Sequence, residues 1–247
     1  MRLTQRVHLV GSGATGADLS NPYDCHVYLV DGGGPLALID AGVGLEPELI
    51  LANVRAAGFD AANIETIALT HAHADHGGGS GPLHELTGAE VLAPGPAADW
   101  LRRADEEAMS LPRARNGGTY PVDYRLAPCP SATSIGGGDT IQVGDVRLTA
   151  IATPGHARAH ISYLIEGDDR TGLFGGDVVF QGGRILLLST PDCSIKDLVA
   201  TMRRLGDMEF EALYPGHAGI SLQRGRQHVD AALRAFDAEE IPPNFNA

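Results

Sequence analysis

The stretch THAHADHGGG, residues 70–79, places His71, His73, Asp75 and His76 within six positions and follows them with three glycines. It continues the apolar run IETIAL, residues 64–69, which predicts a buried strand. Side chains two positions apart in an extended backbone share a side, so the first two histidines can contact one cation. The aspartate and the last histidine, past the turn, can contact a second. Such a site at the end of a strand is typical of α/β sheets.

Short apolar runs and glycine turns before and after this stretch predict strands and helices in a repeated order. Residues 26–42, 139–156 and 160–180 read as hairpins, 211–217 as a strand, and 45–58, 195–205 and 222–240 as helices. Strands followed by a helix therefore occur twice, which predicts two similar halves whose sheets pack face to face with helices outside. With no clear repeat or linker, residues 1–247 are predicted to form one domain.

Residues 95–132 interrupt this rhythm. Residues 97–109 predict an amphipathic helix, and 110–132 are rich in Pro, Gly, Arg and Tyr without a clear period. Two interpretations stay open, a solvated connecting insert and a lid over the site. Side chains that could bind an anionic or aromatic group there are Trp100, Arg113, Arg115, Tyr120 and Tyr124, and the arginines are equally typical of an ordinary surface.

Composition limits the functional classes. The chain has 247 residues and a formal net charge of −13, which argues against a nucleic-acid groove because phosphate binding depends on clustered Lys and Arg. No apolar stretch reaches membrane-spanning length, and the first residues lack a signal-peptide run, so a cytoplasmic location is expected. Cys25, Cys129 and Cys193 fit neither a disulfide framework nor a zinc knuckle. The oligomeric state is not indicated.

Two cations need more ligands than residues 70–79 supply. Three further candidates follow strand-like runs and sit in glycine-bearing turns: His156 in ATPGHA, Asp177 in FGGDVV and His217 in YPGHAG. Five histidines and two aspartates are nitrogen and oxygen donors suited to zinc, iron or manganese. A serine nucleophile is disfavoured, since GSG at 11–13 and GGSG at 78–81 lack the G-x-S-x-G spacing, and GSGATG at 11–16 reads as a loop.

HAHADH, TPGH, GGD and PGH, in this order within residues 27–220, resemble the metallo-β-lactamase superfamily, and Asp40 in LALIDAG matches its first motif. The resemblance implies an α+β fold, a four-layer αββα sandwich of two mixed sheets with helices outside. It implies that His71, His73 and His156 bind one metal ion, that Asp75, His76 and His217 bind a second, and that Asp177 bridges them. The cofactors would be two divalent ions, in first place Zn²⁺, with Fe or Mn as alternatives. A carboxylate has two oxygens and can bridge two cations, which supports the role of Asp177.

This centre predicts a hydrolase for a small-molecule substrate. Two divalent ions about 3.5–4 Å apart lower the pKa of a shared water, and the bridging hydroxide would attack an ester-type bond such as a thioester or lactone. Asp75 is predicted to be catalytic as well as a ligand, because its second oxygen can carry a proton. His160, four residues after His156, is expected to be a structural, hydrogen-bonded histidine.

The substrate stays open among several members of the family. Glyoxalase II enzymes use a C-terminal helical domain, whereas 30 residues follow His217 here, so a thioesterase for another thiol carrier is favoured over the glutathione enzyme. Quorum-signal lactonases place a tyrosine where this chain has Phe180, close to Gln181 and Arg184, which disfavours that subtype. The β-lactamases with this motif are exported, and the first residues here lack a signal-peptide run, which argues against antibiotic resistance as the physiological role. Hydrolysis of a β-lactam or other cyclic amide is kept as an alternative activity.

A second class is a mononuclear iron persulfide dioxygenase, which uses a related ligand set. A third, a binding module with a degraded site, is disfavoured by the intact set of seven ligands. Flavodiiron reductases are disfavoured because they carry Glu where His73 stands and because a flavodoxin domain would not fit in 247 residues.

Overall fold

Two β-sheets form the centre of the computed structural model, which describes residues 1–245. The N-terminal sheet contains β1 (Val7–Gly11), β2 (Val27–Asp31), β3 (Leu36–Ile39), β4 (Ile64–Ala68), β5 (Glu90–Pro94) and β6 (Thr133–Ile135) in this spatial order. The C-terminal sheet contains β7 (Thr140–Val143), β8 (Val146–Ala152), β9 (Ile161–Glu166), β10 (Gly172–Gly176) and β11 (Ala212–Pro215), also in sequence order.

Both sheets are mixed. In the N-terminal sheet β1, β2 and β3 pair antiparallel, and β3 to β6 pair parallel. In the C-terminal sheet β7 to β10 pair antiparallel, and β11 joins β10 in parallel. Because β10 and β11 are parallel, the candidate ligands that follow these two strands lie at the same edge of the C-terminal sheet.

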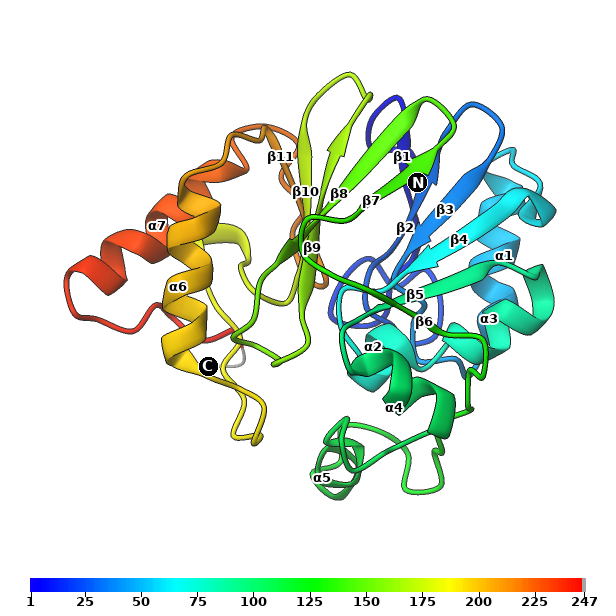
Figure 1. The fold of residues 1–247 in the computed structure, drawn as a ribbon, viewed down its shortest axis with the longest axis horizontal. Coiled ribbons are helices and arrows are strands. Elements are labelled where there is room, and N and C mark those ends of the chain that lie inside the picture. The colour runs from blue at the N-terminus through cyan, green and yellow to red at the C-terminus, as the bar shows by residue number, and fades with distance from the viewer. Residues whose placement is uncertain (246–247) are drawn as a thin grey trace.

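Helices cover the outer face of each sheet (Figure 1). The N-terminal sheet is covered by α1 (Pro47–Ala56), α3 (Ser80–Thr87) and α4 (Ala97–Arg103), and the C-terminal sheet by α6 (Ile195–Gly206) and α7 (Arg226–Asp237). The short helices α2 (Ala74–Gly77) and α5 (Leu111–Asn116) lie beyond the strand ends, and two 3₁₀ turns span Ala61–Asn63 and Gln181–Gly183. The predicted α+β sandwich of four layers is confirmed.

Strand β2 shows why its sequence is apolar without alternation. Tyr28 and Val30 point into the core between the sheets, whereas Val27 and Leu29 point into the core between the N-terminal sheet and its helices. Successive strand residues face opposite sides, and both sides are buried here. A third core lies between the C-terminal sheet and α6 and α7.

Two helices are shorter than their sequence pattern predicts. Helix α4 ends at Arg103 because Ala104 adopts the left-handed conformation (φ 50°). Helix α7 begins at Arg226 because Ser221 instead exchanges backbone hydrogen bonds with Leu213 of β11 (2.8 and 3.0 Å). In both places tertiary hydrogen bonding and backbone conformation override a local helical pattern.

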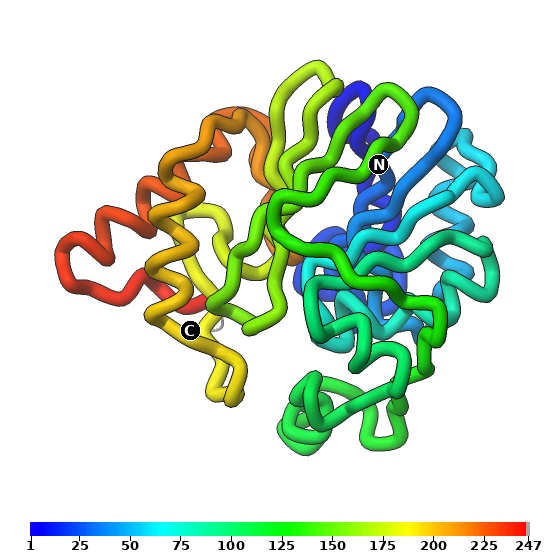
Figure 2. Tube along the Cα trace, viewed as in Figure 1, coloured from blue at the N-terminus to red at the C-terminus, as the bar shows by residue number. Residues whose placement is uncertain are grey.

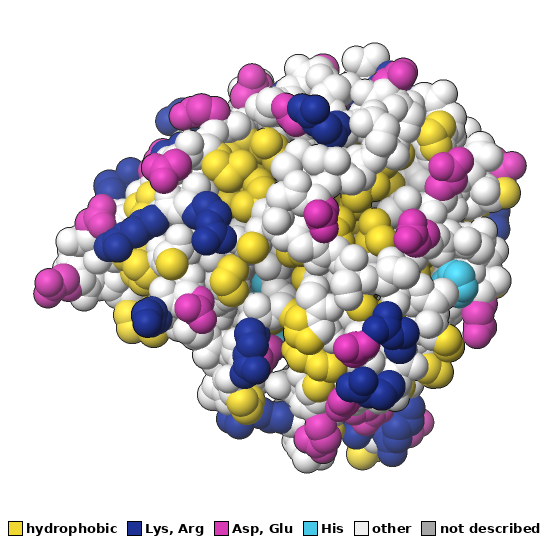
Figure 3. Space-filling model, viewed as in Figure 1, with side chains coloured by type: hydrophobic (Ala, Val, Ile, Leu, Met, Phe, Trp, Pro, Cys, Tyr) yellow, Lys and Arg dark blue, Asp and Glu magenta, His cyan; other side chains and the backbone are white. Residues whose placement is uncertain are grey.

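Across residues 1–245, every helix is too short or too polar to cross a bilayer. On the face drawn in Figure 3, Lys and Arg are interspersed with Asp and Glu, and neither sign forms a continuous patch.

Two tyrosines of the core between the sheets hold the backbone of the loops that carry candidate ligands. Tyr163 of β9 donates a hydrogen bond to the carbonyl of Leu69 (2.8 Å), one residue before the motif at 70–79. Tyr28 of β2 donates to the carbonyl of Pro215 (2.6 Å), two residues before His217. Each bond crosses from one sheet to the other, so the relative position of the sheets and that of the loops are coupled.

We expect Tyr163→Phe to lower the free energy of unfolding by about 1–3 kcal/mol, because it leaves the buried carbonyl of Leu69 without its donor. Urea unfolding followed by circular dichroism measures this change. Tyr214→Phe is the matched control, since the buried Tyr214 hydroxyl has no hydrogen-bond partner among the described residues. Equal stability of the two variants would contradict the role given to Tyr163.

Candidate metal centre

The structure brings all seven predicted ligands together at one edge of the sandwich. His71 and His73 lie in the loop after β4, and Asp75 and His76 lie in the first turn of α2. His156, Asp177 and His217 lie in the loops after β8, β10 and β11. Each sheet therefore contributes ligands, and neither sheet holds a complete set.

Three imidazoles form the first group. The Nδ1 atom of His73 lies 3.1 Å from Nε2 of His71 and 2.9 Å from Nε2 of His156. A neutral imidazole carries one ring proton, so His73 Nδ1 cannot serve both contacts as donor and acceptor at once. The convergence of the three nitrogen atoms is the arrangement expected around a cation.

Two histidines and two carboxylates form the second group. Nε2 of His217 lies 3.1 Å from Oδ2 of Asp75, and Nε2 of His76 lies 3.7 Å from the same oxygen. Asp177 lies between the two groups, with Oδ1 3.4 Å from His76 Nε2, and with Oδ2 3.6 Å from His217 Nε2 and 3.7 Å from His156 Nε2. Its two oxygens therefore face histidines of both groups.

Polar neighbours fix the orientation of most of these rings. Nδ1 of His217 contacts the Thr15 hydroxyl (2.8 Å), and Nδ1 of His156 donates to the carbonyl of Leu186 (3.0 Å). Nδ1 of His76 donates to Oδ2 of Asp40 (2.9 Å). Such partners fix the tautomer, so that the opposite ring nitrogen presents a lone pair to the site.

The carboxylate of Asp40 also organises the backbone of the motif. Its Oδ1 accepts a hydrogen bond from the amide of Thr70 (2.7 Å), and the Thr70 hydroxyl contacts both of its oxygens. Asp40 itself has a φ of 64°, a conformation that Asp and Asn adopt more readily than other residues with a side chain. These contacts agree with the sequence resemblance, which places Asp40 in a motif next to the site.

Burial and neighbouring charges shift the pKa values of the cluster. Burial, followed by the charges of His76 and His73, holds the pKa of His71 well below its ordinary value. Burial also lowers the pKa of His156 to about 4. Burial raises the pKa of Asp177, but His217 and His76 outweigh this effect and hold it well below its usual range. His71 and His156 as neutral imidazoles and Asp177 as a carboxylate are thus in the forms that bind metal ions. Despite burial, Asp177 and Asp75 raise the pKa of His76 and His217, so a cation bound there would displace a proton.

Unpaired polar atoms inside the cluster fit a divalent ion. His76 Nε2 and Asp177 Oδ1 are both buried, and neither has a hydrogen-bond partner among residues 1–245. Buried polar atoms without partners are costly, and a cation that both atoms coordinate would remove that cost. Next to them, a Cβ atom at Gly216 would lie 2.2 Å from Asp177 Oδ1, so glycine keeps this space open. The residues present therefore suit divalent metal binding.

The remaining predicted histidine has a structural role. His160 is buried, its Nδ1 contacts the Thr153 hydroxyl (2.8 Å), and its Nε2 accepts a hydrogen bond from the amide of Asp177 (3.3 Å). It thus holds the backbone of Asp177, as expected for a hydrogen-bonded histidine beside the site.

Three neighbours of the site carry no clear signal in the sequence. Thr15 lies in the glycine-rich loop at 11–16, and Asp192, whose Oδ2 lies 3.6 Å from His73 Nε2, lies in an irregular segment. Cys25 is buried close to Asp40 and His76. The tertiary structure brings these three residues next to the site, and local sequence patterns do not predict such long-range contacts.

A cavity of about 360 Å³ opens from the cluster. The insert supplies Met109, Ser110, Leu111, Arg113, Ala114, Gly117, Thr119 and Tyr120 to its wall, and the opposite side contains Leu186, Leu188, Ser189, Thr190 and Phe245. Candidate ligands His73, Asp75, His156, Asp177 and His217 form its floor, next to Thr15. The wall is mainly apolar, and Arg113 is the only Lys or Arg among the described residues that line it.

Only two of the candidate pocket residues from the insert line this cavity, Arg113 and Tyr120. Arg115 instead forms an ion pair with Glu106 (2.9 Å), and the Tyr124 hydroxyl donates to the carbonyl of Val43 (2.8 Å). Trp100 packs against the core under the helices. These three side chains stabilise the insert.

Phe180 does not line the cavity, and the C-terminal segment forms this part of the wall instead. Phe180 is buried and stacks on Phe245, with ring centroids 4.5 Å apart. Phe245 lines the cavity, and its amide donates to the carbonyl of Ile185 (2.7 Å). Figure 2 shows the C-terminal segment returning to this side of the molecule. Phe180 thus supports the wall, and Phe245 forms it.

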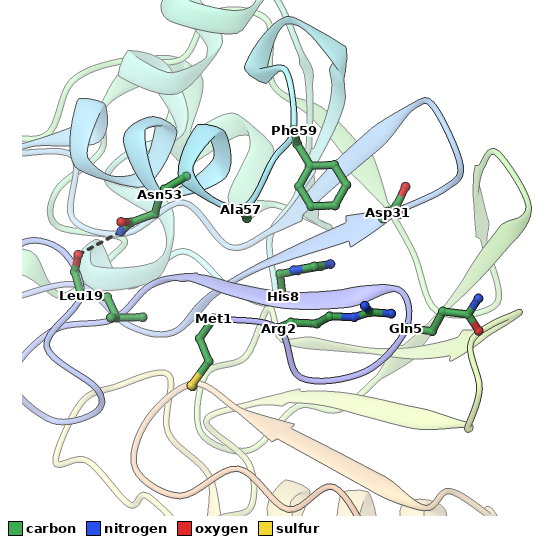
Figure 4. Close-up of a pocket in the computed structure, with 10 residues that line it drawn as sticks. Met1, Arg2, Gln5, His8, Leu19, Asp31, Asn53, Ala57 and Phe59 are labelled. Atoms are coloured by element: carbon green, nitrogen blue, oxygen red, sulfur yellow. Dashed lines mark hydrogen bonds between the residues drawn. The ribbon is translucent and has the colours of Figure 1, made fainter.

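A larger cavity of about 520 Å³ lies near the N-terminus (Figure 4). His8 packs edge-on against Phe59 there, with ring centroids 4.9 Å apart, and Asn53 donates to the carbonyl of Leu19. None of the seven candidate ligands lines it. The chemistry therefore belongs to the smaller cavity.

The family follows from comparison with known proteins. Residues 20–217 match the model of the metallo-β-lactamase superfamily, and the chain belongs to that family. A solved B3 metallo-β-lactamase with an active-site glutamic acid superposes with a TM-score of 0.72 at 25% identity, covering 97% of this chain and 89% of that chain.

Two relatives carry an activity in their names. The human acyl-coenzyme A thioesterase MBLAC2 is 33% identical over 210 residues, which cover 78% of this chain and 72% of that protein. The hydroxyacylglutathione hydrolase of Acidiphilium cryptum is 31% identical over 226 residues, which cover 88% of this chain and 76% of that protein. Together with the family, these relatives assign the chain to the hydrolases, as the sequence predicts.

We expect Asp40→Asn to weaken divalent metal binding by about 10- to 100-fold, because His76 Nδ1 loses its carboxylate acceptor. Asparagine tolerates the backbone conformation at this position, so the loop is retained. Titration of the metal-free protein with Zn²⁺ against a chelator measures the change. Asp31→Asn, in the same sheet but away from the cluster, is the control, and equal affinities for the two variants would contradict the role of Asp40.

Proposed function

We propose that this protein is a dinuclear metal-dependent hydrolase of acyl thioesters. The observation that carries the proposal is the convergence of the ring nitrogens of His71, His73 and His156 beside a carboxylate, Asp177, that faces histidines of both groups. We assign one ion to these three histidines and a second to Asp75, His76 and His217, with Asp177 between the ions. Two divalent ions bound there would supply a hydroxide nucleophile near neutral pH and polarise the substrate carbonyl.

The residues of the chain have distinct parts in this reaction. Asp75 directs Oδ2 toward His217, and its Oδ1 accepts a hydrogen bond from the Tyr120 hydroxyl (2.9 Å), so Oδ2, on the side of the metal centre, is the oxygen that would exchange a proton. The thiolate of a thioester is a good leaving group because a thiol has a pKa near 8.5, and no strong general acid is needed beside it. The hydrophobic wall excludes water from the acyl group.

The cavity supports an apolar acyl group attached to an anionic thiol carrier. Met109, Leu111, Leu186 and Leu188 form its apolar part, whereas Arg113 is exposed at its edge. The thiols named for the two relatives, coenzyme A and glutathione, are both anionic. We therefore infer that Arg113 attracts the negative charge of the carrier.

We also propose that residues 95–132 act as a lid and that residues 1–247 act as one domain. The guanidinium of Arg113 donates to the Ser189 hydroxyl (2.8 Å), which joins the insert to the loop on the opposite side of the cavity. A substrate that enters between them displaces this single exposed bond. Both halves of the chain line the cavity, so neither half forms the site alone.

Zn²⁺ is the proposed metal, and one iron ion is the alternative. A mononuclear iron persulfide dioxygenase would show one iron per chain and oxygen uptake with a persulfide. Metal analysis of the purified protein, combined with a panel of thioesters, lactones and β-lactams, separates these functions. Two zinc ions per chain together with thioester hydrolysis would support the proposal. One iron ion per chain together with oxygen uptake would contradict it.

We expect His71→Ala and Asp177→Ala each to lose bound metal and hydrolysis together, with the catalytic rate reduced by at least about 100-fold. Metal content by elemental analysis and initial rates with an acyl-CoA are measured on the same samples. His84→Ala serves as the control, because the His84 side chain, on α3, donates to the carbonyl of Ala89 and contacts none of the candidate ligands. Full activity of His71→Ala with unchanged metal content would refute the ligand assignment.

We expect Arg113→Ala to raise KM for an acyl-CoA by about two- to fivefold, which is the effect of one exposed ionic contact. The KM for an uncharged thioester with the same acyl group should stay unchanged. Arg103→Ala, on α4 with an exposed guanidinium, is the matched control. The inferred contact with the carrier fails if both thioesters are affected equally.

A further inference from the structure

Tyr120 connects the insert to the candidate metal centre. Its hydroxyl donates a hydrogen bond of 2.9 Å to Oδ1 of Asp75, and its ring is 8% exposed and lines the cavity. In the rest of the insert, residues 95–132, no other hydrogen bond or ion pair to one of the seven candidate ligands is present in the structure. Tyr120 is therefore the residue through which the insert contacts the candidate metal centre.

The hydrogen bond from Tyr120 gives the two oxygens of the Asp75 carboxylate different partners. Oδ2 of Asp75 lies 3.1 Å from Nε2 of His217, and Oδ1 accepts the phenol. The terminal torsion of an aspartate is broad and roughly two-fold, so an untied carboxylate samples several orientations. A donor fixed on Oδ1 selects the orientation in which Oδ2 alone faces His76 and His217.

We propose that Tyr120 is a positioning residue that holds Asp75 as a single-oxygen ligand for the second metal ion and thereby makes the insert a component of the metal centre. The inference rests on the proposed dinuclear site. The phenol is a neutral donor at physiological pH, because its ordinary pKa is near 10. The phenol therefore leaves the negative charge on the Asp75 carboxylate, where it can attract a cation.

The insert holds Tyr120 in place through contacts of its own. Arg115 pairs with Glu106 (2.9 Å) and donates to the carbonyl of Tyr124 (2.7 Å). The Tyr124 hydroxyl is bonded to Val43 of the loop after β3, and its ring lies 5.6 Å from that of Tyr120. The phenol of Tyr120 is thus presented from a cross-linked loop, which is what orientation of a ligand requires.

The decisive variant is Tyr120→Phe, which removes the hydroxyl and keeps the ring. Metal-free protein is titrated with Zn²⁺ against a chelator, and the affinities of the first and second equivalents are determined separately. We expect about a tenfold loss of affinity for one equivalent and no change for the other, since outer contacts of ligands contribute on this scale. With an acyl-CoA and saturating Zn²⁺, KM should stay unchanged while kcat falls.

Tyr124→Phe is the matched control, because it also removes a hydroxyl that anchors the insert but touches no candidate ligand. Equal Zn²⁺ affinities for Tyr120→Phe and the unmodified protein would overturn the proposal. So would equal losses in both variants, which would indicate general loosening of the insert. An unmodified protein that binds no second Zn²⁺ would instead contradict the dinuclear site itself, and the role of Tyr120 with it.

Discussion

The approach of Asp177 to His76, with 3.4 Å between Oδ1 and Nε2, is the contact on which the rest of the structure depends. One residue follows β10 of the C-terminal sheet, and the other lies in the helix that follows β4 of the N-terminal sheet. Neither buried atom has a hydrogen-bond partner among the described residues, and a cation between them would remove the cost of burying them. The two sheets must therefore be held in one relative position, and the aromatic core between them, with Tyr28 and Tyr163 bonded across it, provides that rigidity.

Around this contact the site is built in two layers with different origins. The candidate ligands come from loops at strand ends and from the short helix α2, and Gly216 allows a close approach beside Asp177. The groups that orient them come from elsewhere in the chain: Asp40 after β3, Thr15 in the loop after β1, and Tyr120 in the insert. Orientation by such outer contacts is as important as ligand identity for a metal centre, because it fixes tautomers and carboxylate rotamers before the ion binds.

The substrate cavity depends on segments with weak sequence patterns. The apolar wall combines part of the insert with residues 186–190 and Phe245, which lie far apart in the chain. Phe180, next to the metal-binding motif in sequence, faces away from the cavity and supports Phe245. Sequence proximity to a ligand therefore did not identify the lining residue, because β10 ends in a turn that buries its following side chains.

Much of the architecture could be predicted from the sequence, and so could the seven side chains that the structure brings together as candidate ligands. Hairpins, glycine turns and apolar runs are local signals, and HAHADH, TPGH, GGD and PGH occur in one order with enough specificity to identify the family. The ends of two helices were predicted less accurately. Helix α4 ends at Arg103 and helix α7 begins at Arg226, because backbone conformation and tertiary hydrogen bonds outweigh small differences in helix propensity.

The sequence alone determined which seven side chains are available as ligands, since donor chemistry and spacing are properties of the chain. Only the tertiary structure decided that Arg113 and Tyr120 face the cavity while Arg115 and Tyr124 anchor the insert, because these four share one short segment and similar chemistry. Which of them reaches the metal centre depends on how the insert folds back on the sheet. That path is set by contacts between residues distant in sequence, such as Tyr124 with Val43 and Tyr120 with Asp75.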